Sequence, residues 1–359
     1  MKKDKLKDKL KDKLKDKLKH KLKHKLKHKL KDKDKEKEKD KQNTENIILE
    51  LDKRINELQH STTEDDLPAQ IKELEEQKIS LQKEMYSNLA PYEIVKVARH
   101  HLRPPVSDYI KMMVNDFIEL HGDRNYGDDK AITTGFGNIG GKKVLIIGQH
   151  KGKTTKERID CNFGMPNPEG YRKALQKMKL AEKFHLPIIT LIDTPGANPD
   201  IGAEERGQAH AIAINIAEMS KLRTPVICIV IGEGGSGGAL GIGVGDKFSI
   251  LEYAYCSVIS PEGCAAILWK SKDNAEDAAN ALKLTAKELF KLGIVDEVIP
   301  EPIGAAHSNP EKMANILKET IVRYINELQA VPLDKLIEKR YKKYRKFGSF
   351  LGGEQAATK

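Results

Sequence analysis

The sequence predicts an α/β protein in which parallel strands are joined by crossover helices. From about residue 131 onward, short runs rich in β-branched residues alternate with longer segments of helical periodicity. Several runs end in glycine- or proline-containing turns, for example at 194–196 and 232–238. Strands that alternate with helices in this way pair in parallel. The alternation alone does not distinguish a doubly wound sheet from other α/β architectures.

The first 41 residues differ in composition from the rest of the chain. They contain 21 lysines and nine acidic residues, whereas the remainder contains 42 basic and 44 acidic residues. Leucine recurs every four positions, so no fixed apolar stripe forms along a helix. We predict a low-complexity, disordered tail over 1–43. An arm that binds nucleic acid or an anionic membrane is one interpretation. A repeat expansion tolerated at a terminus is the simpler one.

Composition also excludes several classes of protein. No apolar run reaches the roughly 18 residues of a membrane span, and no apolar segment follows Met1, so we expect neither membrane insertion nor a secretory signal. The four cysteines form no CxxC pair, which argues against zinc and favours a reducing compartment. His100, His101 and His121 lack the spacing of metal ligands. We therefore predict no metal site in this chain.

Residues 44–90 predict a helical hairpin. Apolar residues follow helical spacing over 48–58 and again over 71–85, and Pro68 stands near the start of the second helix. Two long helices with narrow apolar stripes suggest contact with another subunit. Packing on their own domain is the equally plausible alternative.

The remaining chain divides into a central domain over 91–310, C-terminal helices over 311–347 and a flexible tail over 348–359. Strands are expected at 144–149, 188–193, 226–231, 248–251 and 257–259. Helices are expected at 171–184, at 204–219, from Pro261 onward with Ser260 as N-cap, and within 311–345.

The stretch 227–240 runs from a buried strand into a glycine cluster, and three interpretations compete for it. A helix starting near Gly237 leaves unpaired N–H groups that stabilise an anion, either a phosphate or a developing oxyanion. Alternatively, the cluster matches the G-x-S-x-G elbow of hydrolases, with Ser236 as nucleophile and Asp296 and His307 as partners. The third interpretation is a tight packing turn. The local sequence does not choose among them.

Longer motifs narrow the choice. Six of them occur in order, at 117–124, 162–174, 192–197, 202–208, 232–240 and 257–270. Together they resemble the carboxyltransferase alpha subunit of the multi-subunit acetyl-CoA carboxylase of bacteria and plastids, over roughly residues 45–345. The chain departs from that family in its lysine-rich tail and at Asn198-Pro199-Asp200, where Tyr-Pro-Gly is usual.

The resemblance implies a crotonase-like fold built from stacked ββα units. It implies transfer of a carboxyl group from carboxybiotin, held on the carrier protein, to acetyl-CoA. The product is malonyl-CoA, and the reaction belongs to the first committed step of fatty acid biosynthesis. The resemblance also implies partners: a beta subunit that carries zinc and forms an α₂β₂ assembly, the biotin carboxyl carrier protein, and biotin carboxylase, which uses the ATP. The expected location is the bacterial cytoplasm, or the plastid stroma if the chain is plastid-encoded.

The resemblance also assigns the candidate site. Backbone N–H groups of Gly237 and Gly238 form an oxyanion hole for biotin, and Gly234 and Gly235 allow close approach. Ser236 then becomes a loop residue rather than a nucleophile. The candidate substrate-binding residues are Thr194, Pro195, Gly196, Ala197, Ser236, Ala239, Lys151, Lys153 and Arg158. The stretch 194–197 is a second wall of the site or an ordinary strand-ending turn. The basic cluster at 151–158 meets coenzyme A phosphates or is a solvated loop.

Overall fold

The computed structural model describes residues 47–48, 50–51, 53–58 and 67–348, and it divides the chain into two compact units, 1–88 and 89–359. The predicted tail over 1–43 lies outside the described residues, as does nearly all of the C-terminal tail.

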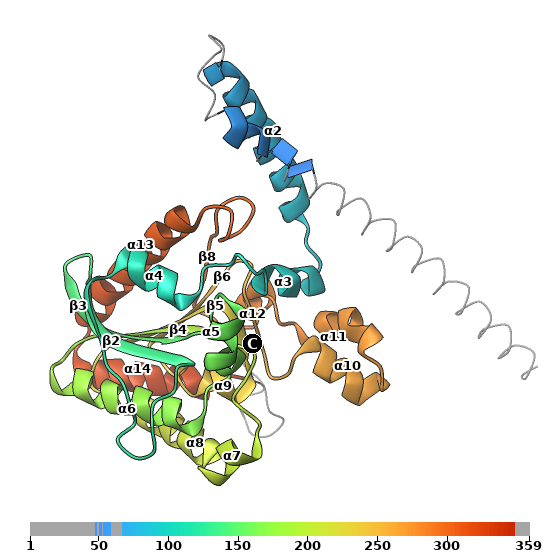
Figure 1. Ribbon diagram of the computed structural model, residues 1–359. Helices are drawn as coiled ribbons and strands as arrows, with labels where there is room; N and C mark the ends of the chain where they lie inside the picture. The colour runs from blue at the N-terminus through green and yellow to red at the C-terminus, as the bar shows by residue number, and fades with distance from the viewer. Residues whose placement is uncertain (1–46, 49, 52, 59–66, 349–359) are drawn as a thin grey trace, which may run out of the picture. The chain divides into compact units, whose positions relative to one another are not determined.

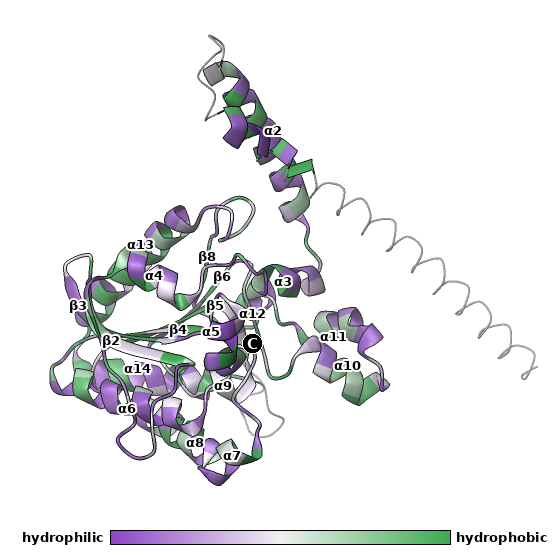
Figure 2. Ribbon diagram, in the orientation of Figure 1, coloured by the Kyte–Doolittle hydropathy of each residue, from purple (hydrophilic) through white to green (hydrophobic). Residues whose placement is uncertain are grey.

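In the first unit, helix α2 (Leu67–Ser87) forms the second arm of the predicted hairpin. Hydrophilic and hydrophobic residues interleave along its length (Figure 2). The described residues of the first arm are helical, and Ile48, Ile55 and Leu58 on its predicted stripe are buried. The turn between the two arms falls outside the described residues.

The second unit is built on one sheet that holds eight strands among the described residues. The strands are β1 (Asn115–Glu119), β2 (Ile132–Ile139), β3 (Lys142–Gln149), β4 (Ile188–Thr194), β5 (Val226–Gly235), β6 (Lys247–Leu251), β7 (Tyr255–Ser257) and β8 (Glu297–Ile299). The order is β1-β2-β3-β4-β5-β6-β8, and β7 pairs with the end of β5. Strands β1 to β3 are antiparallel, whereas β3 to β8 run parallel.

The helices of the second unit are α3 (Pro91–Ala98), α4 (Val106–Met113), α5 (Thr155–Asp160), α6 (Pro168–Lys183), α7 (Ile201–Glu205), α8 (Gln208–Met219), α9 (Ser236–Leu240), α10 (Pro261–Trp269), α11 (Ala275–Leu282), α12 (Ala286–Lys291), α13 (Pro310–Gln329) and α14 (Leu333–Arg345). Two short 3₁₀ helices are also described: Asn162–Gly164 lies between α5 and α6, and Lys272–Asn274 lies between α10 and α11. Figure 1 shows α6, α8 and α14 on one side of the sheet and α4 and α13 on the other. The pair α10 and α11 projects beyond the sheet.

The central strands show why the sequence folds in this way. Every residue of β4 and β5 is buried, as expected for parallel strands covered by helices on both faces. The main hydrophobic core continues into α13 and α14, which contribute Leu317, Ile321 and Leu336. The predicted cap of α10 is confirmed, because Ser260 Oγ accepts a hydrogen bond from the Gly263 N–H.

Several predicted boundaries are wrong. The strand predicted at 257–259 is β7 at Tyr255–Ser257, because these residues pair with the end of β5, and the helix predicted at 171–184 begins at Pro168. Strand β5 does not stop at Ile231 but continues through Gly235, because its terminal residues pair with both β4 and β7. The helix predicted over 204–219 is two helices, α7 and α8, separated by Gly207 at φ +85°. A left-handed residue cannot continue an α-helix, so the chain turns there.

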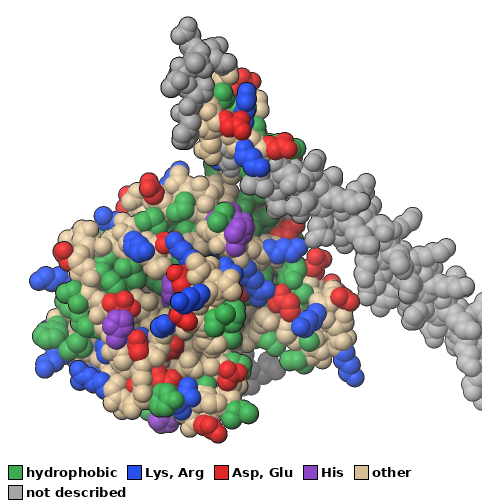
Figure 3. All heavy atoms as spheres, in the orientation of Figure 1, with side chains coloured by type: hydrophobic (Ala, Val, Ile, Leu, Met, Phe, Trp, Pro, Cys, Tyr) green, Lys and Arg blue, Asp and Glu red, His purple; other side chains and the backbone are tan. Residues whose placement is uncertain are grey.

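No helix in the described part of the chain is long and apolar enough to cross a bilayer. On the face of the second unit seen in Figure 3, basic and acidic side chains interleave rather than forming a patch of one sign. This agrees with the near balance of charge outside the lysine-rich tail.

Candidate active site

The glycine stretch forms a strand-to-helix junction. Strand β5 ends at Gly235, and helix α9 begins at Ser236, which has φ +47°. None of the described side chains caps this helix. The N–H groups of Ser236, Gly237 and Gly238 therefore have no partner within the helix, and the helix dipole places positive potential there. Gly237 is half-buried, whereas Gly238 is buried.

The peptide after Gly238 is held from the core side. Its carbonyl oxygen accepts hydrogen bonds from Gln149 Nε2 at 2.8 Å and from the Tyr171 hydroxyl at 3.2 Å. Both donors are fully buried, one at the end of β3 and one on α6. Gln149 Oε1 also accepts from the Asp193 N–H at 3.2 Å. The junction is therefore fixed by rigid elements rather than by a mobile loop.

The stretch 194–197 lies directly against the glycine junction. A Cβ atom built on Gly235 would fall 2.8 Å from the Gly196 nitrogen, and one built on Gly238 would fall 2.6 Å from the Ala197 nitrogen. Only glycine allows backbones to approach so closely. The two predicted walls thus meet in space, although 38 residues separate Thr194 from Gly232 in the sequence.

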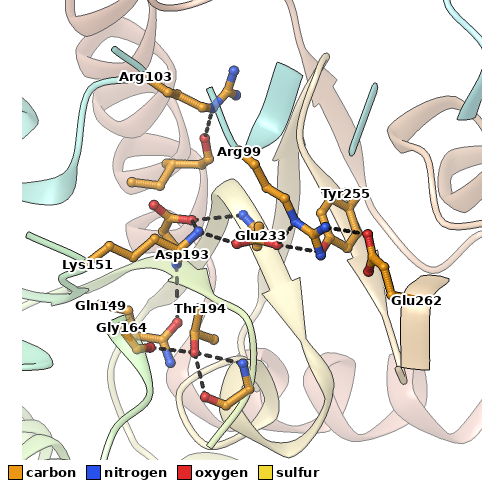
Figure 4. A network of polar contacts seen from close by, with 12 residues as sticks. Arg99, Arg103, Gln149, Lys151, Gly164, Asp193, Thr194, Glu233, Tyr255 and Glu262 are labelled. Carbon is orange, nitrogen blue, oxygen red and sulfur yellow. Dashed lines mark hydrogen bonds and ion pairs between the residues drawn. The ribbon is translucent and has the colours of Figure 1, made fainter. Parts of the chain in front are cut away.

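Thr194 closes its own turn. Its Oγ1 accepts a hydrogen bond from the Gly196 N–H at 3.0 Å and lies 2.7 Å from the carbonyl oxygens of Gly164 and Gly196. The side chain is buried and faces these backbone groups (Figure 4). Thr194 therefore shapes the wall, while the backbone of 195–197 forms its surface.

A network of charged residues lies beside the junction (Figure 4). Lys151 Nζ is 2.6 Å from Asp193 Oδ1 and 2.6 Å from Glu233 Oε2. The Glu233 N–H donates to Asp193 Oδ1 at 2.9 Å. Burial disfavours the charge of Glu233, but Lys151 and Arg99 outweigh it and lower the pKa of Glu233 to about 2. The Glu233 carboxylate and the Lys151 ammonium group, whose pKa its two carboxylate neighbours raise against the effect of burial, are thus charged at neutral pH.

The network extends to α3 and α10. Arg99 Nε is 2.6 Å from Glu233 Oε1, and a second nitrogen of the same guanidinium is 2.7 Å from Glu262 Oε1. The Tyr255 hydroxyl donates to Glu233 Oε1 at 2.5 Å. Arg103 makes a separate, buried pair with Glu301 at 2.6 and 3.0 Å, and donates to the carbonyl oxygen of Ile231 on β5 at 2.7 Å.

A pocket of about 480 Å³ opens over this network. Its lining residues are Ala98, Arg99, His100, His101, Leu102, Arg103, Pro105, Asp108, Lys151, Gly152, Lys153, Arg158, Phe163, Asp193 and Glu233. Lys153 pairs with Asp108 at 2.6 Å and is half-exposed. Arg158 is half-buried and has no ion pair among the described residues. Phe163 is 54% exposed and adopts φ +54°.

The structure therefore separates the residues of the predicted basic cluster at 151–158 into different environments. Lys151 is not a solvated loop residue, because its ammonium group lies between two carboxylates. Lys153 and Arg158 line the pocket. Lys156 is exposed and lies outside the residues that line this pocket.

The hydrolase triad is not assembled. Asp296 accepts a hydrogen bond from the Phe248 N–H at 2.6 Å and pairs with Lys343. His307 stacks on His100 with ring centroids 3.9 Å apart. Neither residue contacts Ser236 in the described structure, and Ser236 is exposed. The G-x-S-x-G match therefore arises from the glycine-rich junction, and Ser236 lacks the partners of a serine nucleophile in the described structure.

Asn198, which departs from the family pattern, serves the fold. Its Nδ2 donates to Asn167 Oδ1 at 2.8 Å, and its Oδ1 accepts from the Asp200 N–H at 3.1 Å. Gln208 Nε2 holds its carbonyl oxygen at 2.9 Å. Because Asn198 is buried with these partners, it supports the turn after the second wall and leaves the wall itself intact.

Sequence reasoning missed Asp193, Glu233, Arg99 and Gln149. The first two stand next to the predicted walls, one before Thr194 and one before Gly234, so a buried acidic residue at each strand end was a signal that could have found them. Arg99 could not have been found, because it lies 134 residues away from Glu233. In the described part of the chain, no cluster of histidine, cysteine and acidic residues has the arrangement of a metal site.

Known proteins share both the sequence and the fold. Residues 41–348 match the family model described as acetyl co-enzyme A carboxylase carboxyltransferase-like. The acetyl-coenzyme A carboxylase carboxyl transferase subunit alpha of Rhodopirellula baltica is 52% identical over 86% of this chain and 97% of its own length. That of Hydrogenovibrio crunogenus is 53% identical over 85% and 96%, and that of Geobacter sulfurreducens is 55% identical over 75% and 84%.

The fold resembles that of transcarboxylase 12S, in a crystal structure with methylmalonyl-coenzyme A and methylmalonic acid bound. The TM-score is 0.53 at 19% identity, over 66% of this chain and 45% of that chain, so this chain spans less than half of the transcarboxylase. This likeness concerns the fold alone, and the predicted crotonase-like architecture is confirmed. From the family model and the relatives, this chain belongs to the family of acetyl-CoA carboxylase carboxyltransferase alpha subunits.

Proposed function

We propose that this chain supplies one half of a carboxyltransferase site, which moves a carboxyl group from carboxybiotin to acetyl-CoA and yields malonyl-CoA. The observation that carries the proposal is the uncapped helix start at Ser236, whose free N–H groups adjoin the close backbone contact between Gly238 and Ala197. The family membership supports the same activity.

The chemistry required of this chain is electrostatic. When carboxybiotin gives up its carboxyl group, negative charge gathers on the ureido oxygen of biotin. The N–H groups of Gly237 and Gly238 are oriented before the reaction and donate to that oxygen. One such donor typically contributes about 2.7–4 kcal/mol of transition-state stabilisation. The deprotonated biotin nitrogen can take the proton from the acetyl group, so no side chain of this chain is needed as a base.

The remaining surfaces serve binding. The backbone of 195–197 and the Ser236 backbone line the space next to the N–H groups, whereas Ala239, also predicted to bind substrate, is buried in the hydrophobic core. Lys153 and Arg158 meet phosphate groups of coenzyme A at the pocket mouth, because Arg158 has no acidic partner in the described structure and Lys153 is half-exposed. Lys151 is not part of this contact, since two carboxylates already neutralise it.

The proposal includes partners. A beta subunit completes the site in an α₂β₂ assembly and carries the zinc. A biotin carboxyl carrier protein presents the biotin, and a biotin carboxylase uses the ATP that loads it. The compartment is the cytoplasm of a bacterium, or the plastid stroma.

A reconstitution tests the function. The purified full chain is mixed with a cognate beta subunit, malonyl-CoA and biocytin, and acetyl-CoA formation is followed against each protein alone. We expect activity only in the mixture. A stable complex without activity contradicts the proposed reaction, and activity of this chain alone contradicts the shared site.

The Gly237→Val variant tests the oxyanion hole. A Cβ atom on Gly237 would meet only Ile212 Cδ1 at 3.7 Å, and Gly237 has no left-handed φ, so the fold accommodates a side chain there. The valine methyl groups would obstruct the N–H groups of the helix start. We expect assembly with the beta subunit to persist while carboxyl transfer falls at least about 100-fold. Normal turnover in the assembled variant refutes the assignment.

A further inference from the structure

Lys151 joins the ends of three neighbouring strands. It follows β3 by two residues, and its ammonium group lies 2.6 Å from Asp193 on β4 and 2.6 Å from Glu233 on β5. These strands are parallel, so their carboxyl ends lie at the same edge of the sheet. The aliphatic part of the side chain also packs at this edge, since a Cβ on Gly164 would fall 2.5 Å from Lys151 Cγ.

The two carboxylates stand immediately before the two walls of the candidate site. Asp193 precedes 194–197, and Glu233 precedes 234–238. The Asp193 carboxylate lies on the β5 backbone: it accepts the Glu233 N–H at 2.9 Å, and a Cβ on Gly232 would fall 2.9 Å from its Cγ. A change in the separation of these carboxylates is therefore transmitted directly to the contact between the walls.

We propose that Lys151 is a positioning residue, whose ammonium group sets the spacing of the two walls and so acts on carboxyl transfer through the N–H groups of Gly237 and Gly238. This inference rests on the proposed function of those N–H groups. This positioning role differs from substrate binding, because the Lys151 ammonium group pairs with two carboxylates of the protein rather than with a ligand.

The surrounding charges explain why no neighbour replaces Lys151. Arg99 and the Tyr255 hydroxyl contact Glu233 from the opposite side, and Arg99 is itself shared with Glu262. Arg103 pairs with Glu301. Although it lies near Asp193, it makes no hydrogen bond or ion pair with Asp193 in the described structure. The titratable and charged groups around the pair are Arg99, Tyr255, Glu262, Tyr92, Arg103, Glu301, Tyr109 and His150, and the same pocket is lined by His100, His101, Asp108, Lys153 and Arg158.

Without the ammonium group, Asp193 and Glu233 would face each other as two like charges in a mostly buried site. Such a pair either separates or takes up a proton. Separation displaces the wall that each carboxylate precedes. A shared proton allows one carboxyl group to donate to the other and restores part of the contact. The loss of function should therefore be relieved as the pH falls.

The experiment uses the full chain in complex with its beta subunit, assayed with malonyl-CoA and biocytin. In Lys151→Met we expect kcat to fall by about 100- to 1000-fold, as when an oxyanion donor is lost, while KM for malonyl-CoA changes by less than about threefold. From about pH 8 to about pH 6, kcat of Lys151→Met should rise relative to the wild type. In Lys151→Ala, propylamine should restore part of kcat by occupying the space of the missing side chain.

Lys130→Met is the matched control, because Lys130 forms an exposed pair with Asp160 at 3.0 Å and has no hydrogen bond or ion pair with a residue of either wall in the described part of the chain. It should retain the wild-type kcat and pH profile. Retained kcat in Lys151→Met, a loss confined to KM for malonyl-CoA, or a pH profile parallel to the wild type would each overturn the inference. An inactive wild-type complex would instead refute the proposed function.

If Lys151→Met fails to assemble, the double variant Lys151→Met/Glu233→Gln replaces it. The glutamine removes one of the facing charges, so assembly should return. We expect kcat of the double variant to stay low and to lose the rise at lower pH. Wild-type kcat in that variant contradicts a positioning role for Lys151.

Discussion

A Cβ atom on Gly238 would lie 2.6 Å from the backbone nitrogen of Ala197. This distance is shorter than Cβ atoms tolerate, so the first turn of α9 and the wall at 195–197 are as close as two backbones can be. The contact brings the free N–H groups of the helix start beside a second backbone surface. The candidate site is built around this contact between Gly238 and Ala197.

Gly238→Ala should separate the two walls. The new methyl group meets backbone atoms of Gly196 and Ala197, which cannot rotate away. We expect the free energy of unfolding to fall by about 1–3 kcal/mol and kcat of the assembled enzyme to fall by about 100-fold or more. Thermal unfolding and the malonyl-CoA assay measure the two effects.

Gly237→Ala is the control for stability, because its Cβ meets only Ile212 at 3.7 Å. Its free energy of unfolding should change by no more than about 1 kcal/mol. Equal destabilisation by both alanines would show that the close contact at Gly238 is not the cause.

Ser236→Ala should reduce carboxyl transfer by less than about tenfold. The Ser236 side chain is exposed, and both candidate triad partners are engaged elsewhere, Asp296 with Lys343 and His307 with His100. Loss of a true serine nucleophile would cost a factor of about 10⁶. The assembled variant is compared with wild type in the malonyl-CoA assay, and labelling of wild type by a fluorophosphonate would contradict this expectation.

Arg340→Met should destabilise the second unit by about 3–5 kcal/mol. Arg340 on α14 is 1% exposed, and it pairs with both oxygens of Asp246 at 2.8 and 2.6 Å. It also donates to three carbonyl oxygens at the end of α8 and just after it, those of Met219, Leu222 and Thr224. The substitution leaves a buried carboxylate unpaired. Denaturant unfolding measures the change.

Lys342→Met is the comparison for Arg340, since Lys342 forms an exposed pair with Glu338 on the same helix. Its effect should stay below about 1 kcal/mol. A similar small effect for Arg340→Met would mean that α14 is not anchored through this residue.

His307 should contribute to acid destabilisation. Its burial, with His100 and Arg103 nearby, lowers its pKa to about 3 in the folded chain. The unfolded chain takes up the proton near pH 6.5, so it binds more protons than the folded chain between these values. Stability should therefore be unaffected above about pH 6.5 and decline as the pH falls toward about 3, by at most about 1.4 kcal/mol per pH unit.

His307→Gln should flatten the pH dependence in this window. The free energy of unfolding of both proteins is measured from about pH 7 to about pH 4. The difference between wild type and variant isolates His307 from the carboxylates, which titrate in both proteins. Parallel curves would show that His307 is protonated in the folded state as easily as in the unfolded state.

The α/β class, the strands β3 to β7 and the two stretches proposed as walls could be predicted from the sequence, whereas β1, β2, β8, α3 to α5, α11 and α12 were not predicted. Continuous apolar runs such as 188–192 and 226–231 identify buried parallel strands, and Ser260-Pro261 identifies a helix start, because each signal is local. Gly234 and Gly235 indicated close backbone approach. The motifs that carry the family resemblance are local in the same sense.

Which residues meet depends on the tertiary structure. The extension of β5 through Gly235 depends on pairing with β7, and the closeness of Gly238 to Ala197 depends on the parallel order of β4 and β5. The environment of the Lys151 side chain shows the reason most clearly. Its sequence context describes a basic loop, but the sheet places two carboxylates from distant strands around its ammonium group. Partners contributed by long-range packing leave no trace in the sequence around a residue, so its charge alone could not reveal its role.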